Sequence, residues 1–336
     1  MKPLDVATLR QFVELAGERL TGDWVILGGS VTRDVVRFPR APEITTGDFD
    51  VRDTLSGALP EPMQRQLREF SATRASVHLG TRRYRYVEYT GLNDLRHTEL
   101  VGLGLFAGVT VGKTLGVLPF GGVAEEDDFY TRGHLSATFP IGSSLVHGRG
   151  TLETRRSQGA WQDVLADADL VGYGRTELFR SHTLLFRASF VGGWNTTLPY
   201  QLSLGGREGV RSLLEDRYPG GRMVRFVFED RVVLPWPDDT ADLGLTFFSD
   251  LGRVWPGDAP YGVDSGWQAA LGFGLRIGLP RTTRHIWRTD IAFPVGATTG
   301  EPIFRVTFEM NQLRNQGFRT PDMVRSRRFQ LGPDTF

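Results

Sequence analysis

Two segments in the last third of the chain contain residue types that can form a charge-assisted pair. One is a glycine-rich loop, Gly205–Leu213, which contains Arg211, and the other is Phe248–Gly252, which contains Asp250. A guanidinium and a carboxylate can pair in a plane through two hydrogen bonds, which fixes geometry as well as adding energy. The residues that share a strand face with Asp250 are mostly small, so they leave room for an incoming loop. We therefore predict that Arg211 contacts Asp250.

The elements that position this pair are long strands in which apolar and polar residues alternate. This pattern is clearest in Trp267–Leu279 and recurs in Asp242–Gly252, Pro302–Asn311 and Gly102–Gly112. A soluble strand is usually about 5–6 residues long, whereas a strand tilted across a bilayer needs about 9–11. The non-apolar faces contain Gly, Thr, Arg and Asp, which is typical of a wet barrel lumen. In Gly102–Gly112, the pattern predicts an apolar outer face that includes Leu103 and Leu105.

The whole chain fits an all-β fold, a transmembrane antiparallel β-barrel with about twelve strands. Residues 24–312 form the predicted barrel, whose first strand is Trp24–Phe38 and whose last is Ile303–Asn311. Connections alternate between short turns and longer loops, as expected for the two rims of such a barrel. Residues 1–23 are predicted as a helical segment, with an amphipathic helix over Asp5–Leu20, and residues 313–336 as a C-terminal extension. Aromatic residues at strand ends predict girdles at the headgroup level: Trp194, Trp236, Trp255, Trp267 and Trp287.

Composition narrows the possible functions. The formal net charge is zero, which gives no indication of a nucleic-acid partner. The absence of cysteine excludes thiol catalysis, disulfides and cysteine-based metal sites. The six histidines do not occur at metal-ligand spacing, and no cofactor is expected. The chain contains no run of about 18 apolar residues, so no membrane-spanning helix is predicted. Since the first twenty residues lack the apolar core of a signal peptide, either the protein stays in the cytoplasm or the chain lacks its true N-terminus.

The stretch Leu204–Phe308 resembles the C-terminal half of the BamA/TamA family of outer-membrane proteins, the bacterial surface-antigen barrel. Four segments carry the resemblance in order: Gly209–Leu213, Phe248–Gly252, Gly272–Arg276 and Arg288–Pro294. Two positions in the loop depart from the family pattern, because Ser212 replaces a glycine and Leu213 replaces an aromatic residue. The family barrel has sixteen strands, so by this resemblance the chain is a partial barrel.

The resemblance implies that the loop folds back into the lumen and packs on the barrel wall. The implied loop residues are Gly209, Val210, Arg211, Ser212 and Leu213, and their implied partners on the wall are Phe248, Asp250 and Gly252. The predicted lumen-lining residues are Arg225, Glu229, Arg276, Arg288 and Asp290.

The implied function is insertion of barrel proteins into the outer membrane, or movement of polypeptides across it, without covalent catalysis. The implied location is the outer membrane of a Gram-negative-type bacterium. The partners would be outer-membrane lipids, client polypeptides and periplasmic assembly factors.

Two alternatives remain at this stage. The first is a passive porin-like or structural barrel with an open lumen. The second is a nucleotidyltransferase-like enzyme, because Gly28-Gly29-Ser30 precedes Asp48-Phe49-Asp50, in which two carboxylates could hold magnesium. That enzyme would need Asp48 and Asp50 next to Gly29 and Ser30 in a mixed α/β unit.

Overall fold

The computed structural model describes residues 22–36, 70–116, 127–175, 181–198, 200–205, 209–214, 217–235, 240–283, 285–298 and 300–310. All regular secondary structure in these ranges is β-strand. The alternating sequence explains this, because successive side chains of a strand point to opposite faces of a sheet. The strands are β1 (Gly22–Val36), β2 (Phe70–Thr90), β3 (Thr98–Thr114), β4 (Asp128–Ile141), β5 (Ser144–Ser157), β6 (Ala160–Gly174), β7 (His182–Trp194), β8 (Leu202–Ser203), β9 (Pro219–Gly220), β10 (Arg222–Val233), β11 (Asp242–Trp255), β12 (Gln268–Gly278), β13 (His285–Val295) and β14 (Ile303–Met310).

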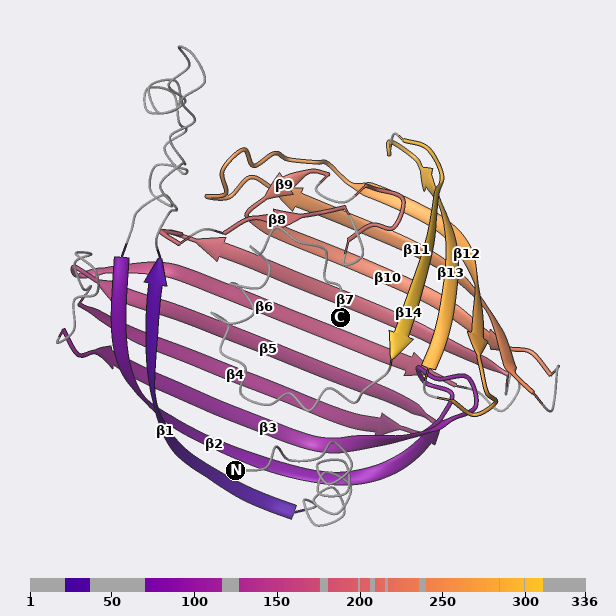
Figure 1. Ribbon diagram of the computed structural model, residues 1–336, viewed down its shortest axis with the longest axis horizontal. Helices are drawn as coiled ribbons and strands as arrows, with labels where there is room; N and C mark the ends of the chain where they lie inside the picture. Colours follow the sequence, from indigo (N-terminus) through magenta and orange to yellow (C-terminus); the bar gives the residue numbers. More distant parts are fainter. Residues whose placement is uncertain are drawn as a thin grey trace, which may run out of the picture.

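Within the described residues, twelve of these strands form one antiparallel sheet (Figure 1). Each strand pairs with the next one along the chain, except that β7 pairs with β10 and the short β8 and β9 pair with each other. In these ranges β1 pairs with β2 alone and β14 with β13 alone, so the sheet is an open, curved trough with two free edges. The predicted all-β antiparallel architecture is present, and closure into a barrel is not seen.

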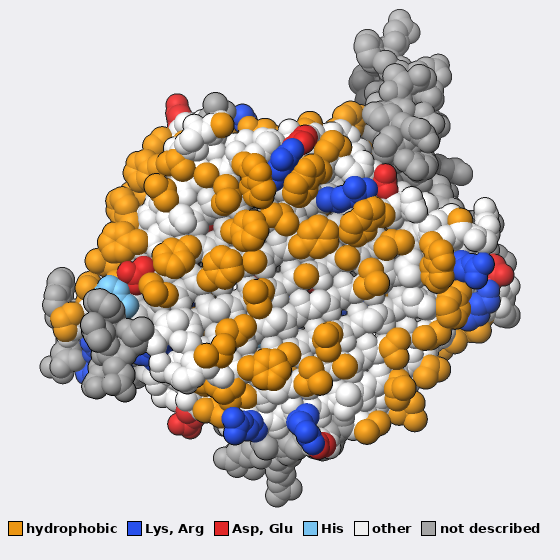
Figure 2. All heavy atoms as spheres, turned by 180° about the vertical axis from the view of Figure 1, so that it is seen from behind, with side chains coloured by type: hydrophobic (Ala, Val, Ile, Leu, Met, Phe, Trp, Pro, Cys, Tyr) orange, Lys and Arg blue, Asp and Glu red, His pale blue; other side chains and the backbone are white. Residues whose placement is uncertain are grey.

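The two faces of the sheet differ in polarity. We call the concave face, on which the described residues of the 195–221 segment pack, the inner face, and the convex face the outer face. On β12, Leu271 and Phe273 are 52% and 48% exposed on the outer face, whereas Ala270 and Arg276 are buried on the inner face. Figure 2 shows hydrophobic side chains spread over the outer face, with charged side chains mostly toward its margins. Period-two alternation thus places apolar groups outside and polar groups inside.

Strand β3 departs from the predicted alternation. Leu103, predicted on the outer face, is buried on the inner face with Leu92 and Leu145, although Leu105 is exposed on the outer face. Gly104 lies between the two leucines with a φ of +140°, a conformation that L side chains rarely adopt. This glycine reverses the alternation, so the prediction for Leu103 was wrong.

The connections gather at two ends of the sheet. Strands β1, β3, β5, β7, β11 and β13 end at one rim, which we call the loop rim, and strands β2, β4, β6, β10 and β12 end at the other, the turn rim. Most of the longer connections lie at the loop rim, as predicted, including the one between β7 and β10. The first strand begins at Gly22, two residues before the predicted start, and β14 ends at Met310.

The predicted helix over Asp5–Leu20 and the extension over 313–336 lie outside the described residues. In the part of the chain that the structure describes, no helix is long and apolar enough to cross a membrane.

Candidate functional site on the inner face

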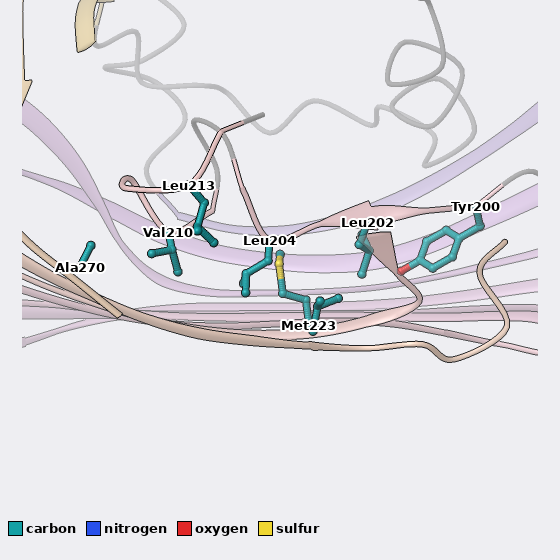
Figure 3. Close-up of a cluster of buried hydrophobic side chains, with 8 residues drawn as sticks. Tyr200, Leu202, Leu204, Val210, Leu213, Met223 and Ala270 are labelled. Atoms are coloured by element: carbon teal, nitrogen blue, oxygen red, sulfur yellow. The ribbon is translucent and has the colours of Figure 1, made fainter. Parts of the chain in front are cut away.

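The segment between β7 and β10 folds back over the inner face of the sheet. Figure 3 shows its apolar side chains directed toward residues of the sheet itself. Burial of apolar surface therefore holds this segment against the wall. The cluster contains Tyr200, Leu202, Leu204, Val210 and Leu213 from the segment, and Met223, Val254 and Ala270 from the sheet.

Arg211 makes the central polar contact of this segment. Its Nε and Nη2 donate to the two carboxylate oxygens of Asp250 at 2.8 and 2.7 Å, and its backbone N–H donates to the same carboxylate at 3.0 Å. Its guanidinium carbon lies 3.5 Å from the ring centroid of Phe248, within the range of a cation–π contact. Burial alone would lower the pKa of Arg211, but the Asp250 and Glu229 carboxylates hold this pKa above its ordinary value. The guanidinium therefore stays charged.

Arg211 belongs to a larger set of charged groups, which we call the Arg211 cluster: Arg211, Arg231, Arg288, Glu229, Asp250 and Asp290. Glu229 is its centre, because it accepts hydrogen bonds from Arg211 at 2.8 Å, Arg231 at 2.8 Å and Arg288 at 3.0 Å. Arg288 also bonds Asp290 at 2.8 Å, and Arg211 lies 3.6 Å from that carboxylate. Three arginines face three carboxylates, so the buried charges are balanced and hydrogen-bonded.

Glycines leave the space that the cluster fills. A Cβ at Gly252 would lie 2.8 Å from Leu204 and 3.1 Å from Val210, both from the incoming segment. A Cβ at Gly272 would overlap the ring of Phe248, and one at Gly274 would overlap the carboxylate of Asp290. The glycine-rich inner face therefore makes room for neighbouring side chains as well as for the loop.

The other predicted site residues also lie on the inner face or against it. Arg225 is buried and donates to the carbonyl of Gly209 at 3.2 Å, and Arg276 donates to the carbonyl of Asn93. Ser212 and Leu213 are both 2% exposed. At the position where the family pattern has an aromatic residue, Leu213 fills the apolar cluster. The structure thus brings most of the predicted residues together around the 195–221 segment, whereas Arg276 contacts Asn93 in the turn between β2 and β3.

A second group of charged residues, which was not predicted from the sequence, holds the start of the same segment. The backbone N–H groups of Thr197 and Leu198 donate to Asp163 at 2.6 and 2.9 Å. Arg155 donates to Asp163 at 2.9 Å and lies 3.3 Å from Asp128. Asp128 also accepts from Arg74 at 2.9 Å, and all four charged side chains are nearly fully buried. The only sequence signal for this group was that its four charged residues occupy the inner faces of their strands.

The turn between β2 and β3, residues 91–97, also contacts the inner face, and we call it the crossing turn. Its Leu92 carbonyl accepts from Arg231 at 2.8 Å, and Arg96 donates to the carbonyl of Leu234 at 2.8 Å. Leu95 is buried, and a Cβ at Gly244 would lie 2.5 Å from it. The turn therefore reaches from β2 and β3 to β10 and β11, across four intervening strands of the sheet order. The sequence of this short turn gave no signal for this placement.

The nucleotidyltransferase alternative depends on Gly29, Ser30, Asp48 and Asp50. Gly29 and Ser30 lie inside β1 in an antiparallel sheet, not in the mixed α/β unit that a nucleotidyltransferase site requires. Asp48 and Asp50 lie outside the described residues. Among the described residues, no group of three His, Asp or Glu side chains is placed to hold a metal ion.

No model of a protein family matches the chain, and no curated protein matches it.

Proposed function

We propose that this chain is an outer-membrane barrel protein that helps other polypeptides to enter or cross that membrane. The observation that carries the proposal is that β1 and β14, within the part of the chain that the structure describes, are unpaired edges of a sheet whose outer face is apolar. A backbone edge in hydrocarbon leaves hydrogen bonds unmade at several kcal/mol each, so it would favour pairing with an incoming strand. In this proposal the edge acts as a template and no covalent step is needed.

The outer face supports a membrane location. On β1 alone, Val25, Leu27 and Val31 are 70–80% exposed. Further exposed apolar side chains follow on every long strand, and such an area exceeds what soluble monomers usually expose. Facing lipid, these side chains would be in a favourable environment, while the charged inner face would line a wet interior.

The segment on the inner face favours a role in polypeptide assembly over a role as a passive porin. The described residues of the 195–221 segment lie on the inner face, where the Arg211 cluster and the Asp163 contacts hold them, and they reduce the free path along that face. A passive porin needs an open lumen. The resemblance to the BamA/TamA family, in which such a loop lies inside the barrel, points to the same role.

Reconstitution of the full chain into liposomes tests the proposal. An unfolded small outer-membrane barrel serves as the client, and its folding is followed by protease protection and by its shifted mobility on unheated gels. We expect the protein to speed client folding several-fold over empty liposomes. Because the chain lacks cysteine, Thr32→Cys on β1 supplies a single thiol for cross-linking to a cysteine-bearing client strand. Thr151→Cys, in the middle of the sheet on β5, is the matched control.

The proposal predicts cross-links from position 32 and not from position 151. Equal cross-linking at both positions would contradict a role for the edge. If ion flux rises while client folding does not, the passive-barrel alternative is favoured. If the chain stays in solution without detergent, the membrane location itself is wrong. Adding periplasmic extract from a Gram-negative bacterium asks whether soluble assembly factors increase the rate.

A further inference from the structure

Basic and aromatic side chains alternate along the loop rim of the outer face. Lys113 on β3 pairs in register with Phe129 on β4, Phe129 with Arg156 on β5, and Arg156 with Trp161 on β6. All four side chains are exposed, and the guanidinium of Arg156 lies 5.9 Å from the ring centroid of Trp161. Four adjacent strands thus present one row of alternating cationic and aromatic groups.

The row continues on the other side of β7. Arg222 on β10 pairs in register with Trp255 on β11, and its guanidinium lies 5.2 Å from the ring centroid of Trp194 on β7. Arg253 lies 5.2 Å from the ring of Trp255. All of these residues lie at the loop-rim ends of their strands. We call the whole set the rim belt: Lys113, Phe129, Arg156, Trp161, Trp194, Arg222, Arg253 and Trp255.

The rim belt carries more positive than negative charge. Two of its four cations form ion pairs among the described residues, since Lys113 pairs with Asp127 and Arg253 with Asp264 at 2.6 Å. For Arg156 and Arg222, the contacts within the described residues are with tryptophan rings. A guanidinium stacked on an indole keeps N–H groups at its edge for an external acceptor. Two such side chains therefore offer anion-binding groups directly beside the apolar outer face.

We propose that the rim belt binds the phosphate groups of lipids in the leaflet next to the loop rim. Tryptophan favours the headgroup level of a bilayer, and a guanidinium matches phosphate oxygens through paired hydrogen bonds. The apolar side chains below the belt, such as Leu135 and Leu152, would contact the acyl chains of the same lipids. The inference rests on the proposed membrane location and adds a lipid preference to it.

Lipid binding to the full chain in nanodiscs tests the inference. The discs contain phosphatidylcholine with a small fraction of phosphatidic acid, and native mass spectrometry counts the phosphatidic acid retained by the protein. The test variant is Arg156→Gln/Arg222→Gln. The control is Arg281→Gln, which removes an exposed cation at the opposite rim. One basic residue near an anionic surface contributes roughly a fivefold change, so we expect the double variant to lose roughly 25-fold in enrichment. The control should match the unmodified protein.

The outcomes separate the two proposals. If the unmodified protein does not enter nanodiscs, the membrane location fails. If it enters and the double variant keeps its phosphatidic acid, the lipid preference is overturned. Displacement of the lipid by an equal concentration of inorganic phosphate would indicate a site for soluble anions and would also overturn the lipid assignment. Circular dichroism of the double variant checks that its strand content is unchanged, and Arg156→Lys/Arg222→Lys, which keeps both charges, should restore part of the binding.

Discussion

Arg211 uses its whole guanidinium. Two nitrogens bond Asp250, the third bonds Glu229, and the planar face lies on Phe248. A lysine at this position could keep the charge, but its compact ammonium has neither the planar fork that pairs with both oxygens of Asp250 nor a flat face to stack on Phe248. The side chain is only 13% exposed and that of Asp250 is fully buried. The contact therefore fixes where the segment lies on the wall.

A double-mutant cycle measures this contact. Arg211→Ala leaves the Asp250 carboxylate buried without its main partner, and Asp250→Ala does the converse. Each single change should reduce the free energy of unfolding by about 3 kcal/mol, because breaking a buried ion pair leaves an uncompensated charge. The double change should cost clearly less than the sum of the singles. Urea-induced unfolding in lipid vesicles or micelles provides the measurement, and additive losses would show that the residues act independently.

Arg253 and Asp264 provide the matched control for that cycle. They form a bidentate pair with distances of 2.9 and 2.6 Å, close to those of Arg211 and Asp250, but both side chains are partly exposed. Exposed pairs contribute about 0–1 kcal/mol. Arg253→Ala should therefore change the unfolding free energy little. A loss as large as that of Arg211→Ala would mean that burial does not set the difference.

Some contacts at this scale could be predicted from sequence and others could not. The contact between Arg211 and Asp250 was predictable, because a glycine-rich loop and a small-residue strand face each carry one charged residue of opposite sign. The pairing of Arg74 with Asp128 was not predictable. These residues lie on β2 and β4, with β3 between them, and they meet only because both side chains point to the inner face. The role of Glu229 as a shared acceptor depends likewise on the register of several strands.

Strand β3 shows how one residue changes the facing of an element. Gly104→Ala should destabilise the sheet by about 1–3 kcal/mol, because a positive φ is strained for alanine. The new Cβ would also overlap the carbonyl oxygen of Arg83 on β2. We expect the inner contact between Leu103 and Leu92 to loosen, and thermal unfolding followed by circular dichroism would report the loss.

Gly133→Ala on β4 is the control for this change. A Cβ there has no atom within 4 Å, and its φ does not lie in the positive region. This substitution should be close to neutral. If the two variants lose equal stability, the backbone conformation of Gly104 is not the cause.

The elements themselves follow from their sequences to within a few residues. Alternation locates a strand because one of its faces lies in apolar surroundings and the other in polar surroundings, as in β12 and β14. The same rule cannot place the crossing turn, which has no periodicity and is positioned by long-range contacts such as that between Arg96 and Leu234. It also cannot detect the reversal at Gly104, because glycine has no side chain whose polarity would indicate which face of the strand it occupies.

On the scale of the molecule, segments from opposite rims meet on the inner face. The 195–221 segment starts at the loop rim and the crossing turn starts at the turn rim. They are joined through two side chains, since Glu229 bonds Arg211 of the segment and Arg231, and Arg231 bonds the carbonyl of Leu92 in the turn. A change at one rim therefore has a physical route to the other.

Replacing Arg231 should loosen both segments together. Arg231→Gln removes a charge-assisted bond to Glu229 and another to the carbonyl of Leu92. A loss of about 1.4 kcal/mol at each bond would raise amide hydrogen exchange about tenfold in residues 91–97 and in residues 209–213. Arg96→Gln removes the contacts with Leu234 and Asp242 and leaves the bond between Arg231 and Glu229 in place, so it should raise exchange in the turn and leave 209–213 unchanged. Mass spectrometry of exchanged peptides separates the two regions. If Arg231→Gln affected only the turn, Glu229 would be held well enough by Arg211 and Arg288, and the two rims would be independent.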